Sequence, residues 1–180
     1  LHIPGEHNIY NAMAAMVAAI HTGIDPQTAA DSVAHFGGTK RRFEILGKVK
    51  GFTVADDYAH HPAELKVTLT AAQDMGFQQV WAVFQPFTFS RTSMLLEEFA
   101  QVLPIADHVV LTPIMGSREK NIYGIHATDL GQKIPGCVCL GSFEEIADYI
   151  LQHAQPGDLV ITLGCGDVYK CAKLILERGK

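Results

Sequence analysis

The sequence predicts an α/β protein with a Rossmann-like, mainly parallel β-sheet that carries helices on both faces and is preceded by a short helical hairpin. Two observations lead to this fold class. From Thr53 onward, short β-branched and apolar runs alternate with segments of helical periodicity, whereas residues 1–36 contain helical patterns only. Repeated strand–helix units connect through right-handed crossovers, which place helices on both faces of a parallel sheet.

Residues 1–36 are expected to form two helices joined by a short turn. The first begins after Gly5 and ends at Gly23. Asp25 and Pro26 provide the N-cap and the first residue of the second helix. A hairpin of this size cannot bury a core of its own, so we expect it to pack on the following domain or on sequence outside this chain.

A break in the helical pattern at Gly37–Gly38–Thr39 marks the expected domain boundary, which divides residues 1–38 from residues 39–180. Two extended runs, Phe43–Lys50 and Phe52–Tyr58, begin the second part. Later strands are expected at Gln79–Phe84, Asp107–Thr112, Cys137–Leu140 and Asp158–Leu163. Later helices are expected at Thr92–Leu103, Thr128–Ile134, Phe143–His153 and Asp167–Arg178.

Composition restricts the function classes. With 180 residues, 48% of them hydrophobic, the chain can bury a sizeable core, and its net charge of −5 provides no basic surface for nucleic acid. We see no apolar run long enough for a membrane span and no signal peptide, so we expect a cytoplasmic protein without a membrane partner. Leu1 is not an initiator methionine, and we expect a piece of a longer protein.

The four cysteines are interpreted as buried free thiols, because neither pair has the C-x-x-C spacing of a zinc or redox site. No metal ligands are predicted in this chain. Cys137 and Cys139 are expected to point to opposite faces of their strand.

The most informative segment is Phe52–Leu69, which begins as a strand pattern, passes through a polar loop and continues at helical spacing after Pro62. In an open α/β sheet, ligands bind in the crevice beyond the carboxyl ends of the strands. An Asp-rich turn with a helix cap would explain either aspartate alone, but five polar or titratable side chains together indicate a functional loop. These five are Asp56, Asp57, Tyr58, His60 and His61.

Three shorter patterns leave alternatives open. Asn8 and Asn11 share one helix face, where their amides either match the donor and acceptor of an adenine edge or serve in capping and solvent contact. Lys40–Arg41–Arg42 is either a solvated turn or a source of a guanidinium for phosphate oxygens. The long connection Pro113–Thr128 is either functional or a mobile, solvated loop.

Two further segments bear on anionic ligands. Arg91 follows the strand VWAVF at a helix start, where the macrodipole disfavours a cation, so a carboxylate or phosphate ligand would explain it. The segment LGCGD, Leu163–Asp167, lacks the third glycine of a dinucleotide site, and we interpret Asp167 as the N-cap of the last helix. No G-x-x-x-x-G-K-[ST] occurs, so the phosphate loop of an ATP user would lie outside this chain.

Five segments, in this order and at these separations, resemble the Mur ligase family, and the similarity covers the whole chain. They are GEHNIYNAMAA, RRFEILG, DDYAHHPAEL, FQPFTFSRT and GCGDVYK. The motif DDYxHHP with the downstream SRT is specific for the branch that joins L-alanine to UDP-N-acetylmuramate in peptidoglycan synthesis. Family members have a UDP-sugar domain, a central P-loop ATPase domain and a Rossmann-like C-terminal domain. The resemblance therefore implies that residues 1–38 are the last helices of the central domain and residues 39–180 the complete C-terminal domain.

The resemblance implies ATP-dependent amide formation through an acyl phosphate, with ATP and Mg²⁺ as cofactors. By this likeness His7, Asn8 and Asn11 contact the adenine, Asp57 holds the ribose, and Arg42 reaches the terminal phosphates. The magnesium ligands and the phosphate loop are expected in the missing central domain. The chain alone is therefore expected to be inactive.

For the amino acid, the resemblance implies a pocket lined by Tyr58, His60 and Arg91. His60 or His61 is the candidate to accept a proton from the incoming ammonium. One departure from the family pattern is that Phe87 replaces a histidine and Thr88 stands where some relatives carry arginine. The amino acid is therefore left open, and a ligase for a preformed peptide or a non-catalytic nucleotide- or amino-acid-binding module remain alternatives.

Overall fold

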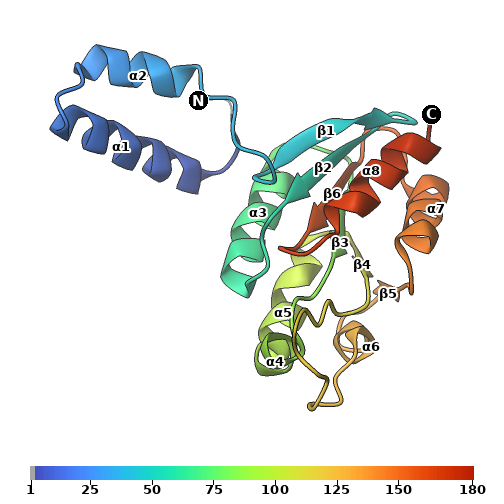
Figure 1. Ribbon diagram of the computed structural model, residues 1–180. Coiled ribbons are helices and arrows are strands. Elements are labelled where there is room, and N and C mark those ends of the chain that lie inside the picture. The colour runs from blue at the N-terminus through green and yellow to red at the C-terminus, as the bar shows by residue number, and fades with distance from the viewer. Residues whose placement is uncertain (1–2) are drawn as a thin grey trace.

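The structure, a computed structural model, describes residues 3–180. A six-stranded sheet with helices on both faces forms the body of the molecule, and two N-terminal helices extend away from it (Figure 1). The sheet is mainly parallel, which confirms the predicted Rossmann-like fold class and its preceding helical hairpin. Within residues 3–180, no helix combines the length and the apolar character needed to cross a bilayer.

The hairpin consists of α1 (Glu6–His21) and α2 (Pro26–Ala34). As predicted, the side chain of Asp25 caps α2 by accepting a hydrogen bond from the backbone N–H of Thr28 at 3.0 Å. No residue of α1 is buried, and Val17 on this helix is 66% exposed. The hairpin therefore gains little stability from contact with the body of this chain.

The strand order in the sheet is β1-β2-β6-β3-β4-β5, with β1 antiparallel to β2 and all other neighbours parallel. The strands are β1 (Glu44–Val49), β2 (Phe52–Asp57), β3 (Val80–Phe84), β4 (His108–Leu111), β5 (Val138–Cys139) and β6 (Leu159–Leu163). In the register of the three central strands, Leu163 of β6 pairs with Asp57 of β2 and with Phe84 of β3. The loops after these three strands therefore begin at one edge of the sheet, which we call the carboxyl edge.

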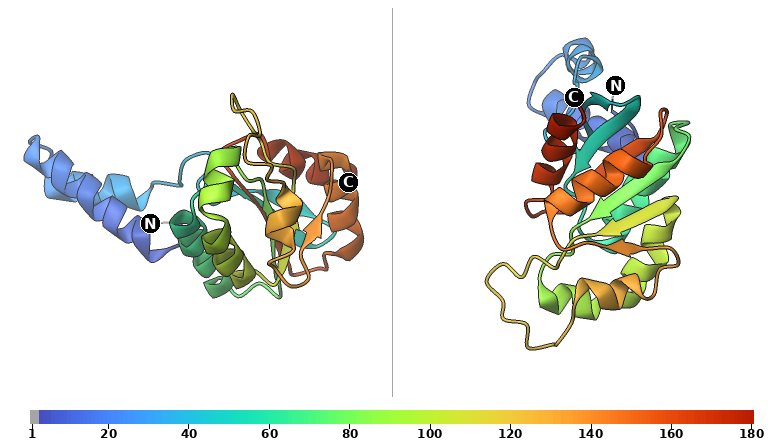
Figure 2. Two further views of the ribbon diagram at one scale, coloured as in Figure 1. Left: turned by 90° about the horizontal axis from the view of Figure 1, so that it is seen from below. Right: turned by 90° about the vertical axis from the view of Figure 1, so that its right-hand side faces the viewer.

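Helices cover the two faces of the sheet and bury a separate cluster on each (Figure 2). One face packs against α3 (Pro62–Asp74), α5 (Leu96–Val102) and α6 (Ala127–Gly131). The other packs against α7 (Phe143–His153) and α8 (Tyr169–Arg178). Side chains of β3 alternate between the clusters, with Ala82 in the first and Trp81 in the second, because a strand has a period of two.

Two predictions about local structure are wrong. The single helix expected at Thr92–Leu103 is divided at Leu95 into α4 (Phe89–Met94) and α5, which is followed by the 3₁₀ turn η1 (Leu103–Ile105). Cys137 and Cys139 do not point to opposite faces, because a Cβ placed on Gly131 would lie 3.7 Å and 2.5 Å from their sulfur atoms. Residues two apart in a strand share a face, which places both thiols on the α6 side of the sheet.

Ile161→Ala tests the core contribution of β6. Ile161 is fully buried in the strand that joins β2 to β3, so the variant is expected to lose about 2–5 kcal/mol of unfolding free energy. The matched control is Ile122→Ala, whose side chain is 80% exposed and whose effect should stay within about 0.5 kcal/mol. Urea denaturation of both variants measures the difference, and equal losses would contradict this assignment of the core.

Candidate functional site

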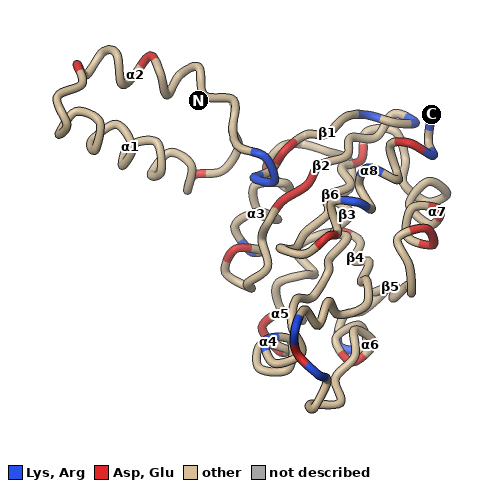
Figure 3. The backbone as a smooth tube through the Cα atoms, viewed as in Figure 1, with Lys and Arg blue, Asp and Glu red and all other residues tan. Residues whose placement is uncertain are grey.

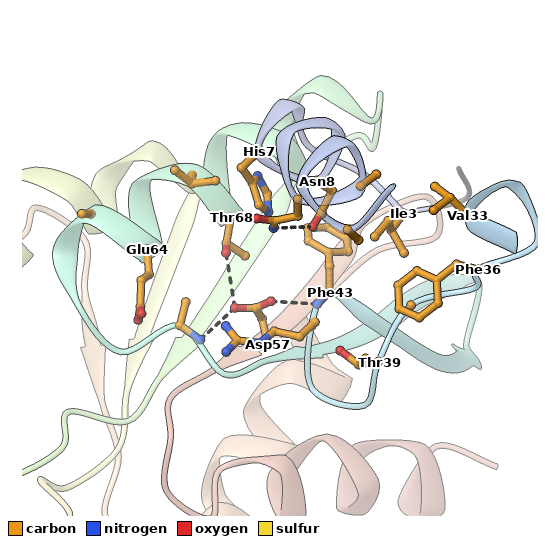
Figure 4. A pocket seen from close by; sticks show the side chains of 18 of the residues that line it. Ile3, His7, Asn8, Val33, Phe36, Thr39, Phe43, Asp57, Glu64 and Thr68 are labelled. Carbon is orange, nitrogen blue, oxygen red and sulfur yellow. Dashed lines mark hydrogen bonds between the residues drawn. The ribbon is translucent and has the colours of Figure 1, made fainter. Parts of the chain in front are cut away.

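A cavity of about 870 Å³ lies between the hairpin, the segment that enters β1, and the start of α3 (Figure 4). This volume falls in the range of small-molecule sites, and the lining combines apolar side chains with a few polar groups. The five residues assigned to ATP from the sequence all line it: His7, Asn8, Asn11, Arg42 and Asp57. The cavity therefore brings together side chains from both sides of the expected domain boundary.

The two asparagines are oriented by local hydrogen bonds. The amide nitrogen of Asn8 donates to the carbonyl of Pro4 at 2.6 Å, and that of Asn11 donates to Asn8 Oδ1 at 3.4 Å. Asn8 is not the N-cap of α1, because Gly5 occupies that position without a side-chain bond. The capping alternative for Asn8 is therefore wrong, and both amides remain at the cavity wall.

Asp57 is almost completely buried at the end of β2 and holds three segments together (Figure 4). Its carboxylate accepts hydrogen bonds from the backbone N–H of Phe43 at 2.7 Å, the backbone N–H of Ala59 at 2.8 Å and the hydroxyl of Thr68 at 3.3 Å. A carboxylate has about four acceptor positions, so these bonds leave capacity for one more donor at the cavity. Its contact with a ribose remains a prediction.

Arg41, which the sequence interpretation passed over in favour of Arg42, forms an ion pair with Asp56. Figure 3 shows the basic segment before β1 close to the acidic residues of β1 and β2. The Nε of Arg41 lies 2.9 Å from a carboxylate oxygen of Asp56, which is 1% exposed and also accepts from the hydroxyl of Thr162 at 2.7 Å. Burial raises the pKa of Asp56, although the hydrogen bonds from Thr162 and Arg41 oppose that rise. The sequence did contain a signal for this ion pair. Two aspartates end a buried strand, and a buried carboxylate requires a charged partner.

The two histidines of the loop after β2 have different roles. His61 is the N-cap of α3, and its Nδ1 accepts the backbone N–H of Ala63 at 3.2 Å, so that lone pair is used by the helix. Nδ1 of His60 lies 3.1 Å from the carbonyl of Tyr58 and 3.2 Å from a carboxylate oxygen of Glu64. Two acceptors facing Nδ1 favour the tautomer protonated there, which leaves the lone pair on Nε2.

Glu64 completes the capping box of α3. Burial by itself would raise its pKa, but the backbone N–H groups of His60 and His61 donate to its carboxylate at 3.0 and 3.2 Å. Together with the positive charge that His60 carries when protonated, these bonds outweigh burial and lower the pKa of Glu64.

Arg91 lies in the first turn of α4 after a strained residue. Thr88, the N-cap, has φ 64°, a left-handed conformation that a β-branched residue rarely adopts. Its hydroxyl accepts from the backbone N–H of Arg91 at 3.4 Å, and its own N–H donates to the carbonyl of Met115 at 2.9 Å. Such strain persists only where surrounding contacts hold it, and it is common at functional sites. The ion pairs among residues 3–180 do not include one to Arg91.

The connection after β4 is tied to α4 by Glu119. One carboxylate oxygen of Glu119 accepts the backbone N–H of Ser90 at 2.9 Å, and the other accepts the Ser90 hydroxyl. These bonds from Ser90, aided by the nearby charge of Arg91, lower the pKa of Glu119. The connection is therefore held against the segment that carries Arg91.

Cys165 lies in the loop after β6, where charges from several segments of the chain affect its thiol. Burial raises the pKa of its thiol, while the nearby positive charges of Arg91 and Arg41 lower it and the charge of Glu64 raises it. Charges carried by α4, by α3 and by the segment before β1 therefore act on one thiol after the end of β6.

The interpretation of Asp167 as the N-cap of α8 is wrong, because Val168 is the N-cap. The side chain of Gln85 instead contacts both residues that precede α8. Its carbonyl oxygen accepts the backbone N–H of Val168 at 3.2 Å, and its amide donates to Asp167 at 2.9 Å. Gln85 follows β3, so this contact depends on the pairing of β3 with β6.

No group of three or more histidine, cysteine, aspartate or glutamate side chains within residues 3–180 is arranged to hold a metal ion. The residues that the structure describes therefore do not fit a resident magnesium site.

Comparison with known proteins identifies the family. The profile described as "Mur ligase, glutamate ligase domain" matches residues 41–166. The chain belongs to the Mur ligase family. This Mur ligase chain is 44% identical over 182 residues to a UDP-N-acetylmuramate–L-alanine ligase of Caldicellulosiruptor saccharolyticus, and 44% identical over 179 residues to one of Alkaliphilus metalliredigens. The alignments cover 99% and 98% of the chain but only 40% and 39% of those relatives.

Solved structures agree with the family and the fold. The Mur ligase chain superposes on UDP-N-acetylmuramate-alanine ligase of Thermotoga maritima with a TM-score of 0.80 at 24% identity, covering 98% of this chain and 38% of the other. A murein peptide ligase of Psychrobacter arcticus matches with a TM-score of 0.68 at 29% identity, covering 96% and 37%. The first likeness supports the fold alone, because its identity is low.

Glu64→Gln tests the capping box through its pH dependence. At neutral pH the variant is expected to lose roughly 0.5–1 kcal/mol of unfolding free energy. This is the lower end of the range for helix caps, because the Glu64 side chain is 43% exposed. Folding lowers the pKa of Glu64, so its carboxylate stabilises the folded state fully above the unfolded pKa of about 4.3. This stabilisation is lost as the pH falls through the folded-state pKa.

The difference between wild type and Glu64→Gln should therefore shrink below about pH 4.3. Thermal denaturation at a series of pH values measures it. Glu98→Gln, in the first turn of α5, is the matched control. A Glu64→Gln difference that stays constant on acidification would rule out this role.

Proposed function

We propose that this chain is the C-terminal part of an ATP-dependent ligase that joins L-alanine to UDP-N-acetylmuramate in peptidoglycan precursor synthesis. The observation that carries the proposal is that one cavity is lined by the asparagines, Arg42 and Asp57, and that Asp57 ends β2 at the sheet edge where the segments carrying Tyr58, His60 and Arg91 begin. Relatives with this printed activity share 44% identity with nearly the whole chain.

The proposal includes the domain assignment. Residues 1–38 would be the end of a central ATP-binding domain, and residues 39–180 the domain that brings the amino acid. Two observations support it: α1 has no buried residue, and the chain spans 40% of the length of a related ligase. The missing N-terminal and central domains of the same protein would then be its partners.

For ATP, we assign the adenosine part to the cavity. The amides of Asn8 and Asn11 have the donor and acceptor groups that an adenine edge requires, with His7 beside them, and Asp57 retains an acceptor position for a ribose hydroxyl. Arg42 is exposed at the same cavity and can reach phosphate oxygens. The phosphate loop and the magnesium ligands would come from the remaining sequence.

For the amino acid, Arg91 would bind the carboxylate. Nε2 of His60 would receive a proton from the ammonium group of the amino acid. The neutral amine then attacks the acyl phosphate formed from the sugar carboxylate, phosphate leaves, and an amide bond results. Closure of the domains excludes water, which would otherwise hydrolyse the acyl phosphate.

A ligase that adds a preformed peptide is the second candidate. Phe87 and Thr88 replace polar groups of the family pattern, and a murein peptide ligase shares 29% identity with this chain. A panel of L-alanine and short peptides offered to the full-length enzyme separates the two activities. Faster amide formation with a peptide than with L-alanine would favour the peptide ligase.

The chain alone is expected to form no amide from ATP, L-alanine and UDP-N-acetylmuramate. The motif G-x-x-x-x-G-K-[ST] does not occur in this sequence, so the γ-phosphate lacks its binding loop. Phosphate release, measured with chain and full-length enzyme in parallel, checks this expectation, and turnover by the chain would refute it.

Calorimetry with ATP on the chain separates the ligase fragment from a regulatory binding module. The fragment is expected to bind with a Kd of about 1 mM or weaker, because only the adenosine part of the site and Arg42 are present. A micromolar Kd for ATP or an amino acid in the isolated chain would support the binding module instead.

Arg91→Ala in the full-length enzyme is expected to raise KM for the amino acid about tenfold or more, the effect of losing a charged hydrogen bond. KM for ATP should change little, because Arg91 does not line the nucleotide cavity. Arg178→Ala, at the last turn of α8, is the matched control. An unchanged amino-acid KM in Arg91→Ala would remove Arg91 from the pocket.

A further inference from the structure

The neighbouring residues Arg41 and Arg42 face different surroundings. The guanidinium of Arg41 donates from Nε to Asp56 at 2.9 Å, from Nη1 to the carbonyl of Gly166 at 3.1 Å, and from Nη2 to the carbonyl of Gly164 at 2.6 Å. Arg42 is exposed and lines the cavity, whereas Arg41 is not among the residues that line it. One arginine is therefore committed to protein contacts and the other is available to a ligand.

The backbone on either side of Arg42 is fixed to the end of β2. Arg41 and Phe43 both have left-handed φ values, 59° and 46°. The carbonyl of Arg41 accepts the backbone N–H of Tyr58 at 2.8 Å, and the backbone N–H of Phe43 donates to Asp57 at 2.7 Å. Left-handed conformations of ordinary residues persist only when such contacts hold them. The direction of Arg42 therefore depends on the bonds of its neighbours.

The Tyr58 ring is also placed by this arrangement. The guanidinium carbon of Arg41 lies 4.9 Å from the centre of the Tyr58 ring and 5.0 Å from that of Tyr169. The guanidinium of Arg42 lies 5.6 Å from the same Tyr58 ring. Cations at these distances attract an aromatic face, so both guanidinium groups contribute to placing the Tyr58 ring.

We propose that Arg41 is a positioning residue that holds the Arg42 guanidinium toward the cavity and the Tyr58 ring at the amino-acid end of the site. It acts through Asp56 and the two carbonyls of the loop after β6, and it touches neither reactant. The proposal rests on the ligase function proposed above. Lysine cannot replace Arg41, because an ammonium is a point charge that does not span a carboxylate and two carbonyls.

In the full-length enzyme, Arg41→Lys is expected to lower kcat about a hundredfold, the effect of displacing a reacting group by about 1 Å. Lys40→Met is the matched control, since Lys40 is the exposed basic residue before Arg41 and does not line the cavity. Its kcat should equal that of wild type. Wild-type kcat in Arg41→Lys would overturn the proposal.

A double-mutant cycle with Arg42→Ala separates positioning from general destabilisation. If Arg41 acts by placing Arg42, then adding Arg41→Lys to Arg42→Ala lowers kcat far less than the same change does in the wild-type background. A residue with a merely structural role would lower kcat by the same factor in both backgrounds. Equal factors therefore overturn the proposal even if each variant is folded.

Hydrogen exchange on the isolated chain provides a test that does not require catalysis. Well below the unfolding temperature, Arg41→Lys should speed exchange of the Tyr58 amide and of the loop at Gly164–Gly166, while α5 exchanges as in wild type. Unchanged exchange at both places would overturn the positioning role. If the full-length wild-type enzyme forms no amide, the ligase function is wrong, and this experiment still decides whether Arg41 fixes these segments.

Discussion

The parallel pairing of β6 with both β2 and β3 is the constraint on which the site depends. Because the three strands are in register, Asp57, Leu163 and Phe84 end side by side at the carboxyl edge. Each of these loops therefore starts about 4.8 Å from the loop of the adjacent strand, and only the width of β6 separates the loops after β2 and β3. For this reason Asp57, which lines the cavity, ends at the same edge of the sheet as the strand that leads to Arg91.

The two adjacent aspartates at the end of β2 connect this edge to both faces of the sheet. Successive side chains in a strand point to opposite faces. Asp56 therefore binds Arg41 and Thr162 on the α8 side, while Asp57 binds Thr68 of α3 and faces the cavity. One aspartate fixes the loop after β6, and the other fixes the entry to α3.

The start of α4 is held by a strained residue and by the carboxylate of Glu119. Thr88 keeps a left-handed backbone through its bonds to Met115 and to the first turn of α4. Glu119 joins the long connection after β4 to the same turn through Ser90. These contacts fix the backbone at Arg91 without using its side chain.

The sequence by itself determined the fold class, most of the elements and the residues that gather at the cavity. Helical and strand periodicity, the Asp25–Pro26 start of α2 and the DDYAHHP loop are local signals, because each depends on residues within a few positions of one another. The tertiary structure alone decided that Arg41 pairs with Asp56, and that Gln85 contacts Asp167 and Val168 before α8. Both contacts join segments that are distant in the chain, so they exist only after the strands have paired, and spacing along the sequence does not encode them.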